Sequence, residues 1–265
     1  MNSIFGRMRK SLRKAGRTPK LSIRTATLRD IPEIVDVELA AWGAEGSASA
    51  DKLESRIRIF PEGQRVAVVE ESGARKIVGF VSTMRLSFAQ VLQLTSWAQI
   101  TNDGYISSHD PGGDYLYGVD LSVRNGYERM GVGNLLLGEI AEMVVKNGIR
   151  YGLLGGRLPG LREFNDRRIS GGLPPLKPGE YIELRRDDGR LFDRELRFYM
   201  SIWSMENLGV LPNYFSDPDS LDNGVLLRWP NPLYRWFFLL GLPYRLPLIG
   251  RLVVWLNAKV IKALV

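Results

Sequence analysis

The residues best suited to chemistry lie in a loop with two glycines near the middle of the chain. The sequence Leu121-Ser-Val-Arg-Asn-Gly-Tyr-Glu-Arg-Met-Gly-Val-Gly-Asn-Leu-Leu136 runs from an expected strand through this loop into an expected helix. Gly131 and Gly133 let the backbone approach an anion closely, and a helix start offers unpaired N–H groups and a positive dipole end. The segment therefore predicts a pyrophosphate-binding site, to which Arg129 adds a charge-assisted contact.

A dinucleotide-binding fold is the first alternative for such a loop. Its fingerprint, G-x-G-x-x-G, lies early in a doubly wound sheet, directly after a strand. Here the loop follows the fourth expected strand, and Gly131-Val-Gly133 is not followed by the third glycine. The pattern therefore disfavours a Rossmann fold.

Composition restricts the remaining chemistry. The chain has no cysteine and one histidine, so neither disulfides nor a thiolate or histidine-rich metal centre is possible, and no metal is expected. His109 titrates near neutrality and precedes the strand expected at 115–123, which makes it a catalytic candidate. The alternative is a loop histidine that bonds to the backbone.

The elements that must position these residues form a mixed α+β set. Alternating and apolar runs predict strands at 23–28, 66–70, 77–83, 115–123, 150–154, 208–214 and 224–229. Helices are expected after Asp30, and at 50–60, 133–146 and about 190–206. Residues 86–113 are interpreted as an insertion, and the strand at 150–154 is expected to run parallel to the one at 115–123.

The glycine loop resembles the acyl-CoA-binding motif of the GNAT superfamily, approximately Q/R-x-x-G-x-G/A after an L-x-V strand. Glu128-Arg-Met-Gly-Val-Gly133 matches both glycines, with Glu128 where the family has Gln or Arg. The element order over residues 22–230 is also similar. The resemblance implies an α+β GNAT fold with a mixed central sheet and flanking helices. The residues after this domain are expected to add a C-terminal amphipathic helical tail.

Four segments look like the GNAT domains that precede a carbon–nitrogen hydrolase (nitrilase-like) domain in some bacterial proteins. They are His109-Asp-Pro-Gly-Gly-Asp-Tyr-Leu-Tyr-Gly-Val-Asp120, Gly155-Gly-Arg-Leu-Pro-Gly160, Leu208-Gly-Val-Leu-Pro-Asn-Tyr214 and Trp229-Pro-Asn-Pro232.

The superfamily resemblance implies an enzyme that moves an acyl group, expected to be acetyl, from acetyl-CoA or a longer acyl-CoA to a primary amine. A carboxylate on the strand before the loop often acts as base, which indicates Asp120, and a tyrosine often protonates the thiolate, which indicates Tyr199. A structural carboxylate and an aromatic core residue are the respective alternatives. The expected acyl-CoA contacts are Leu121, Val123, Arg129, Met130, Gly131, Val132, Gly133 and Asn134.

Positive charge is concentrated at the two ends of the chain. Residues 1–24 hold eight Lys/Arg and residues 223–265 hold six, and all 29 acids lie between them. The acidic middle argues against nucleic acid as a partner. Residues 1–21 are expected to be a basic arm: disordered, an amphipathic surface helix, or an organellar transit segment.

The tail over 233–265 is apolar and cationic. Recurrent cations and the interruptions at Pro243 and Pro247 argue against a membrane-spanning helix. As a helix it would group its last cations beside Trp255, next to a broad apolar face. With the basic arm, this predicts a cytoplasmic protein, peripheral to an anionic membrane, with its GNAT domain at 22–232. The alternative is that the tail packs on the domain or on a second subunit of a homodimer.

Two other functions fit the same residues. One is a non-catalytic acyl-CoA-binding or membrane-recruitment module. The other is an N-acyltransferase that takes its acyl group from an acyl-carrier protein, whose acidic surface would contact a basic end.

Overall fold

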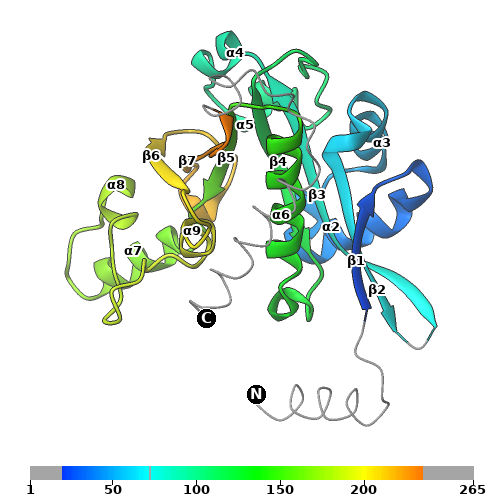
Figure 1. Ribbon diagram of the computed structural model, residues 1–265. Coiled ribbons are helices and arrows are strands. Elements are labelled where there is room, and N and C mark those ends of the chain that lie inside the picture. Colours follow the sequence, from blue (N-terminus) through cyan, green and yellow to red (C-terminus); the bar gives the residue numbers. More distant parts are fainter. Residues whose placement is uncertain (1–19, 72, 235–265) are drawn as a thin grey trace.

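The computed structural model describes residues 20–71 and 73–234, and a mixed seven-stranded sheet organises them (Figure 1). Its strand order is β1-β2-β3-β4-β5-β7-β6, and only the β4/β5 pair is parallel. The strands are β1 (Lys20–Thr25), β2 (Gln64–Glu71), β3 (Ala74–Leu86), β4 (Tyr115–Val123), β5 (Tyr151–Arg157), β6 (Glu206–Leu211) and β7 (Gly224–Pro230).

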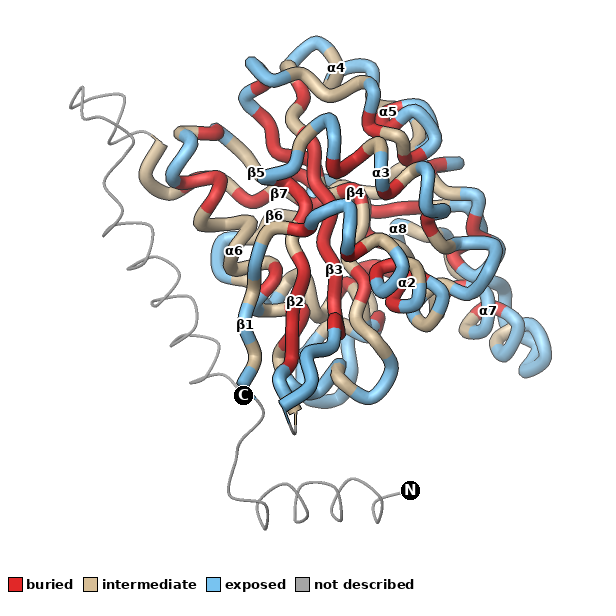
Figure 2. The backbone as a smooth tube through the Cα atoms, turned by 90° about the vertical axis from the view of Figure 1, so that its right-hand side faces the viewer, coloured by how far each residue is buried: buried red, intermediate tan, exposed pale blue. Residues whose placement is uncertain are grey.

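Helices cover both faces of this sheet. They are α2 (Ile31–Gly46), α3 (Ala50–Ile59), α4 (Phe88–Leu92), α5 (Trp97–Thr101), α6 (Val132–Lys146), α7 (Leu161–Ser170), α8 (Pro178–Tyr181) and α9 (Arg194–Met200). Successive side chains of β2 point to opposite faces of the sheet and so belong to two different cores. Val66 and Val68 pack under α2 and α3, whereas Ala67 and Val69 pack under α6. Buried backbone is accordingly concentrated along the central strands (Figure 2).

A β-bulge in β4 changes which way its side chains point. Thr83 of β3 pairs with Gly118, and Ser82 pairs with Asp120, so Val119 is the extra residue. Val119 packs in the core cluster of α5, and Asp120 contacts α2 and α3 on the same face of the sheet. The bulge therefore re-aims Asp120, which regular alternation would place on the opposite face, toward α6.

Strands β4 and β5 separate after a short ladder. Residues 115–118 pair with residues 151–154, but β4 continues to Val123 and β5 continues to Arg157. Beyond Gly118, β4 pairs only with β3, and beyond Leu154, β5 pairs only with β7. The sheet is thus split on its parallel side, next to the bulge.

The sequence-based elements are largely confirmed, including the parallel crossover into β5. The helix expected over about 190–206 is wrong at both ends, because Asp193 caps α9 and β6 begins at Glu206. Helices α7 and α8 were not expected, and the insertion contains α4 and α5. Most of the basic arm and nearly all of the tail lie outside the described residues.

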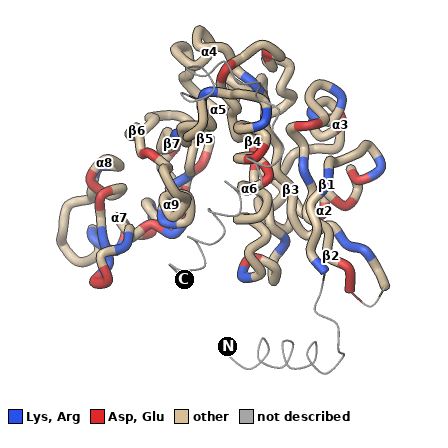
Figure 3. The backbone as a smooth tube through the Cα atoms, viewed as in Figure 1, with Lys and Arg blue, Asp and Glu red and all other residues tan. Residues whose placement is uncertain are grey.

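No helix within residues 20–71 and 73–234 is long and apolar enough to cross a bilayer. Acidic and basic positions are interspersed over the same residues (Figure 3).

The close packing of the turn that leads into β4 requires a glycine at position 113 but not at position 112. A Cβ at Gly113 would lie 2.3 Å from the backbone carbonyl carbon of Leu86, whereas one at Gly112 would meet only Asp110 Oδ1, at 3.4 Å. We expect Gly113→Ala to lower the free energy of unfolding by about 2 kcal/mol, because backbone atoms cannot yield as a flexible side chain can. Gly112→Ala is the control and should change it by less than about 0.5 kcal/mol. Urea unfolding measures both, and equal effects would contradict this packing.

Candidate active site

A cleft of about 1360 Å³ passes through the sheet where β4 and β5 separate. On one side of the sheet its wall includes Met130, Asn134 and Ile140, from α6 and the turn before it. On the other side it includes Trp42 of α2 and Arg56 of α3. A molecule held in this cleft could therefore extend from one face of the sheet to the other.

The start of α6 forms one end of the cleft. Gly131 has a φ of 77°, and a Cβ there would meet no atom within 4 Å, so the backbone is open to a ligand. The first N–H groups of an α-helix have no intrahelical acceptor. The side-chain Oδ1 of Asn134 is buried without a hydrogen-bond partner among the described residues. The open backbone and the free N–H groups fit an anionic group at this position, and Asn134 Oδ1 can accept a hydrogen bond from a donor on the same ligand.

The other expected acyl-CoA contacts fall into two groups. Leu121 lines the cleft together with Met130, Gly131 and Asn134. The second group supports the loop by packing and does not line the cleft. Val123 and Val132 belong to the core under α6, and Gly133 is buried against Phe198. Arg129 is exposed on the short 3₁₀ turn Glu128–Met130, outside the cleft wall.

Glu128 stands where the family has Gln or Arg. Its Oε2 accepts a hydrogen bond from the backbone N–H of Gly126 at 2.8 Å. The carboxylate therefore closes the loop before α6.

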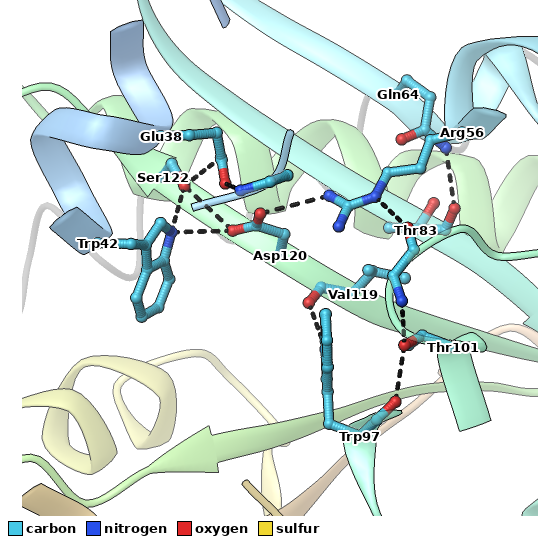
Figure 4. A network of polar contacts seen from close by, with 12 residues as sticks. Glu38, Trp42, Arg56, Gln64, Thr83, Trp97, Thr101, Val119, Asp120 and Ser122 are labelled. Atoms are coloured by element: carbon cyan, nitrogen blue, oxygen red, sulfur yellow. Dashed lines mark hydrogen bonds and ion pairs between the residues drawn. The ribbon is translucent and has the colours of Figure 1, made fainter. Parts of the chain in front are cut away.

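Asp120 lies in the cleft wall at the bulge, within a polar network (Figure 4). Its Oδ1 accepts hydrogen bonds from the indole N–H of Trp42 at 3.2 Å and from the Ser122 hydroxyl at 3.0 Å. Its Oδ2 lies 3.4 Å from an Arg56 guanidinium nitrogen. Three elements thus fix this carboxylate at the edge of the cleft.

Arg56 is the buried cation of the network. Its side chain is 1% exposed, and its Nε donates to the carbonyl of Gly104 at 2.7 Å. An unpaired buried charge is costly, and the neighbouring carboxyl group of Asp120 supplies the partner that Arg56 needs.

Glu38 of α2 completes the network from inside the protein. It is fully buried, and its Oε1 lies 2.6 Å from Ser122 Oγ. Burial, and next the nearby negative charge of Asp120, raise the pKa of Glu38 well above its usual value.

Tyr199 and Glu195 line the cleft from α9, one helical turn apart. Burial, and next the charge of Glu195, raise the pKa of Tyr199, so its phenol keeps its proton at neutral pH. Burial also raises the pKa of Glu195 to about 7, although Arg157 opposes this. The α9 wall therefore presents one proton donor and one carboxyl group that titrates near neutrality.

Arg157, at the end of β5, spans the cleft. Its guanidinium lies 5.1 Å from the ring centroid of Trp42 and makes two contacts with Asp217, at 2.7 and 2.8 Å. Burial opposes ionisation of Asp217, but the hydrogen bonds from Arg157 and Ser220 lower its pKa overall.

His109 does not belong to this site. Its Nδ1 accepts a hydrogen bond from the backbone N–H of Arg85 at 3.0 Å, and its ring stacks on Phe60 at 4.5 Å. Burial, and then the charge of Arg85, lower the pKa of His109. The structure thus supports the alternative of a loop histidine bonded to the backbone, because the side chain is absent from the described cleft wall.

Sequence reasoning missed Glu38, Trp42, Arg56, Ser122 and Glu195. For two of them a signal was present: Glu38 follows Ile34 and Val37 at helical spacing, and Arg56 lies between Leu53 and Ile57. Both charged residues therefore occupy positions on buried helix faces.

Over the described residues, no group of three or more His, Cys, Asp or Glu side chains is arranged to hold a metal ion.

Comparisons with known proteins show the family to which this chain belongs. No family model matches the chain. It is 30% identical over 219 residues to the "uncharacterized N-acetyltransferase YkwB" of Bacillus subtilis (strain 168), covering 81% of this chain and 91% of that protein. It is 26% identical over 216 residues to the "probable hydrolase YhcX" of the same organism, of which it spans only 39%.

Two solved structures share the fold. The loading GNATL domain of CurA from Lyngbya majuscula superimposes with a TM-score of 0.64 at 20% identity, covering 80% of this chain and 98% of that one. The GphF GNAT-like decarboxylase in complex with isobutyryl-CoA gives 0.63 at 23%, covering 79% and 99%. The chain therefore belongs to the GNAT N-acetyltransferase family. By this membership, which the 30% identity to YkwB shows, it is a GNAT-type N-acyltransferase.

The buried pair of Arg56 and Asp120 has a testable energetic role. We expect Arg56→Met to lower the free energy of unfolding by about 3 kcal/mol, because it leaves Asp120 and the Gly104 carbonyl without their buried partner. Arg58→Met, on the same helix, removes only an exposed pair with Glu54 and should cost less than about 0.5 kcal/mol. Chemical denaturation of both variants checks this, and equal stabilities would show that the buried pair contributes nothing.

Proposed function

We propose that this protein transfers an acyl group, acetyl in the first instance, from acyl-CoA to a primary amine inside the cleft. The observation that carries the proposal is the course of the cleft through the sheet, from the open start of α6 to Asp120. The fold neighbour GphF, described in complex with isobutyryl-CoA, supports an acyl-CoA ligand. In this arrangement the first N–H groups of α6 hold the pyrophosphate, and Leu121 flanks the acyl-bearing arm.

In the proposed transfer, an acceptor that binds as ammonium first releases one proton to solvent. The neutral amine then forms a C–N bond as the thioester C–S bond breaks, its nitrogen loses one further proton, and the thiolate gains one. Asp120 accepts the amine proton, because it is a carboxylate fixed at the cleft edge. Tyr199 donates the proton to the thiolate from the α9 wall. Proton donor and acceptor thus come from separate elements.

The charge of the cleft supports a cationic acceptor. The described wall contains eight acids and three cations, so its field attracts an ammonium group. The acids are Glu45, Asp103, Asp120, Glu139, Glu195, Asp217, Asp219 and Asp222, and the cations are Lys52, Arg56 and Arg157.

We also propose a relationship to the GNAT domains that precede a carbon–nitrogen hydrolase domain. The support is the similarity of this chain to 39% of the length of a protein named as a probable hydrolase.

We propose in addition that the protein works on a membrane surface, on the cytoplasmic side. The support is sequence alone: the two ends are free of acids, and as a helix the tail would add a broad apolar face beside its cations. Both ends together give reversible attachment to anionic lipid.

The cofactor site is tested by matched tryptophan substitutions in one loop. Gly131 and Gly126 both have positive φ and open space around a Cβ, but only Gly131 lines the cleft. We expect Gly131→Trp to raise the KM for acetyl-CoA by about tenfold or more, since it occupies the ligand's place. Gly126→Trp carries the same backbone strain and should leave this KM within about twofold. Unchanged acetyl-CoA kinetics in Gly131→Trp would refute the site.

The membrane proposal is tested by co-sedimentation with vesicles that contain phosphatidylserine. We expect the full chain to sediment with them, and a chain ending at Pro232 to sediment much less, because it lacks the apolar face and most C-terminal cations. Equal partitioning of both would remove the tail from the proposal. A loss of dimers on truncation, without lipid binding by either chain, would favour the subunit-contact alternative.

A further inference from the structure

A chain of three side chains connects the cleft to the protein interior (Figure 4). Asp120 Oδ1 lies 3.0 Å from Ser122 Oγ, which lies 2.6 Å from Glu38 Oε1. Glu38 and Ser122 are fully buried, and Asp120 is 9% exposed at its side chain. Two carboxyl groups therefore share one buried hydroxyl, one of them at the cleft wall and the other in the interior.

The number of available hydrogens defines the protonation state of these three side chains. The Ser122 hydroxyl has one hydrogen, and Trp42 Nε1 donates to Ser122 Oγ at 2.6 Å without accepting one. Ser122 can therefore donate to only one of the two carboxyl groups. The other must carry a proton to hydrogen-bond to Ser122, because two acceptors cannot bond to each other.

The surroundings decide which carboxyl group holds the proton. The charged groups that face Glu38 are Asp120 of β4 and Arg56 of α3, and the hydrogen bond of Arg56 goes to Asp120. Asp120 also receives the indole N–H of Trp42. Glu38 has only the backbone N–H of Ala48, at 3.3 Å from Oε2, besides Ser122. Asp120 thus has two donors besides Ser122, one of them cationic, whereas Glu38 has one, and the proton is therefore assigned to Glu38.

We infer that Glu38 is a positioning residue for Asp120: its protonated carboxyl group donates to Ser122, and Ser122 in turn donates to Asp120. This inference rests on the proposed function, in which Asp120 accepts the amine proton. The arrangement keeps a single negative charge, that of Asp120, next to Arg56. Ionisation of Glu38 would place a second negative charge two hydrogen bonds away and favour protonation of the base.

Replacement of Glu38 by glutamine and by leucine tests the inference. In Glu38→Gln, the amide oxygen accepts from Ala48 and the amide N–H donates to Ser122, as the protonated acid does. Leucine does neither. We expect Glu38→Leu to lower kcat about tenfold and to move the acidic limb of the kcat/KM profile, and Glu38→Gln to restore both most of the way. Asp36→Asn, which alters an exposed carboxylate of the same helix, is the control.

The opposite result would overturn the inference. If Glu38→Gln is as impaired as Glu38→Leu, while its KM for acetyl-CoA and its unfolding midpoint stay at wild-type values, then the carboxylate form of Glu38 is the one required. Should the variants fail to fold, infrared spectroscopy of the wild-type protein gives an independent reading. A protonated carboxyl band at neutral pH is expected in the wild-type protein and also in Glu195→Gln, which removes the other carboxyl group that titrates near neutrality. Its absence would refute the inference.

Asp120→Asn separates this inference from the proposed function. Full activity of Asp120→Asn contradicts the role of Asp120 itself, whatever Glu38 does. Loss of activity in Asp120→Asn together with a failed glutamine rescue contradicts only the role of Glu38.

Discussion

Beyond Gly118 and Leu154 the backbones of β4 and β5 no longer pair, and the N–H and C=O groups exposed at this internal edge need other partners. One is supplied by Trp97, whose indole N–H donates to the carbonyl of Val119 at 2.9 Å. The bulge at Val119 lies at the same place, and it turns Asp120 toward α2 and α3. The cleft, the orientation of Asp120 and the position of Trp97 all follow from this interruption of the sheet.

The interruption exposes polar groups to the protein interior, and the buried ones among them are paired locally. Arg56 is buried with Asp120, Arg157 is paired with Asp217, and Glu38 is held by Ser122 and Ala48. Removing one member of such a set costs more than the set contributes, because the remaining group stays buried and unpaired. Stability and the proposed proton transfer thus depend on the same side chains.

Much of this architecture could be predicted from the sequence, because its signals are local. The glycine loop, the helix start behind it and the strand before it are adjacent in the chain, and α6 begins at Val132, one residue before the position expected. The network around Asp120 joins residues up to 84 positions apart, through a bulge that only strand pairing defines. Glu38 and Arg56 were nevertheless detectable as charges on apolar helix faces. The shortened α9 shows the opposite case: the mixed polar and apolar pattern over 190–206 resembled one helix, but α9 ends at Met200 and pairing with β7 assigns Glu206 to β6.

The central claim is that acyl-CoA binds in the cleft between α6 and the split sheet. The most direct measurement is the thermal unfolding of the full-length protein with and without acetyl-CoA. At one hundred times its dissociation constant, a ligand of the native state adds about 2.7 kcal/mol, and a clearly raised midpoint is the predicted result. An unchanged midpoint with acetyl-CoA, free CoA and palmitoyl-CoA alike would contradict the account.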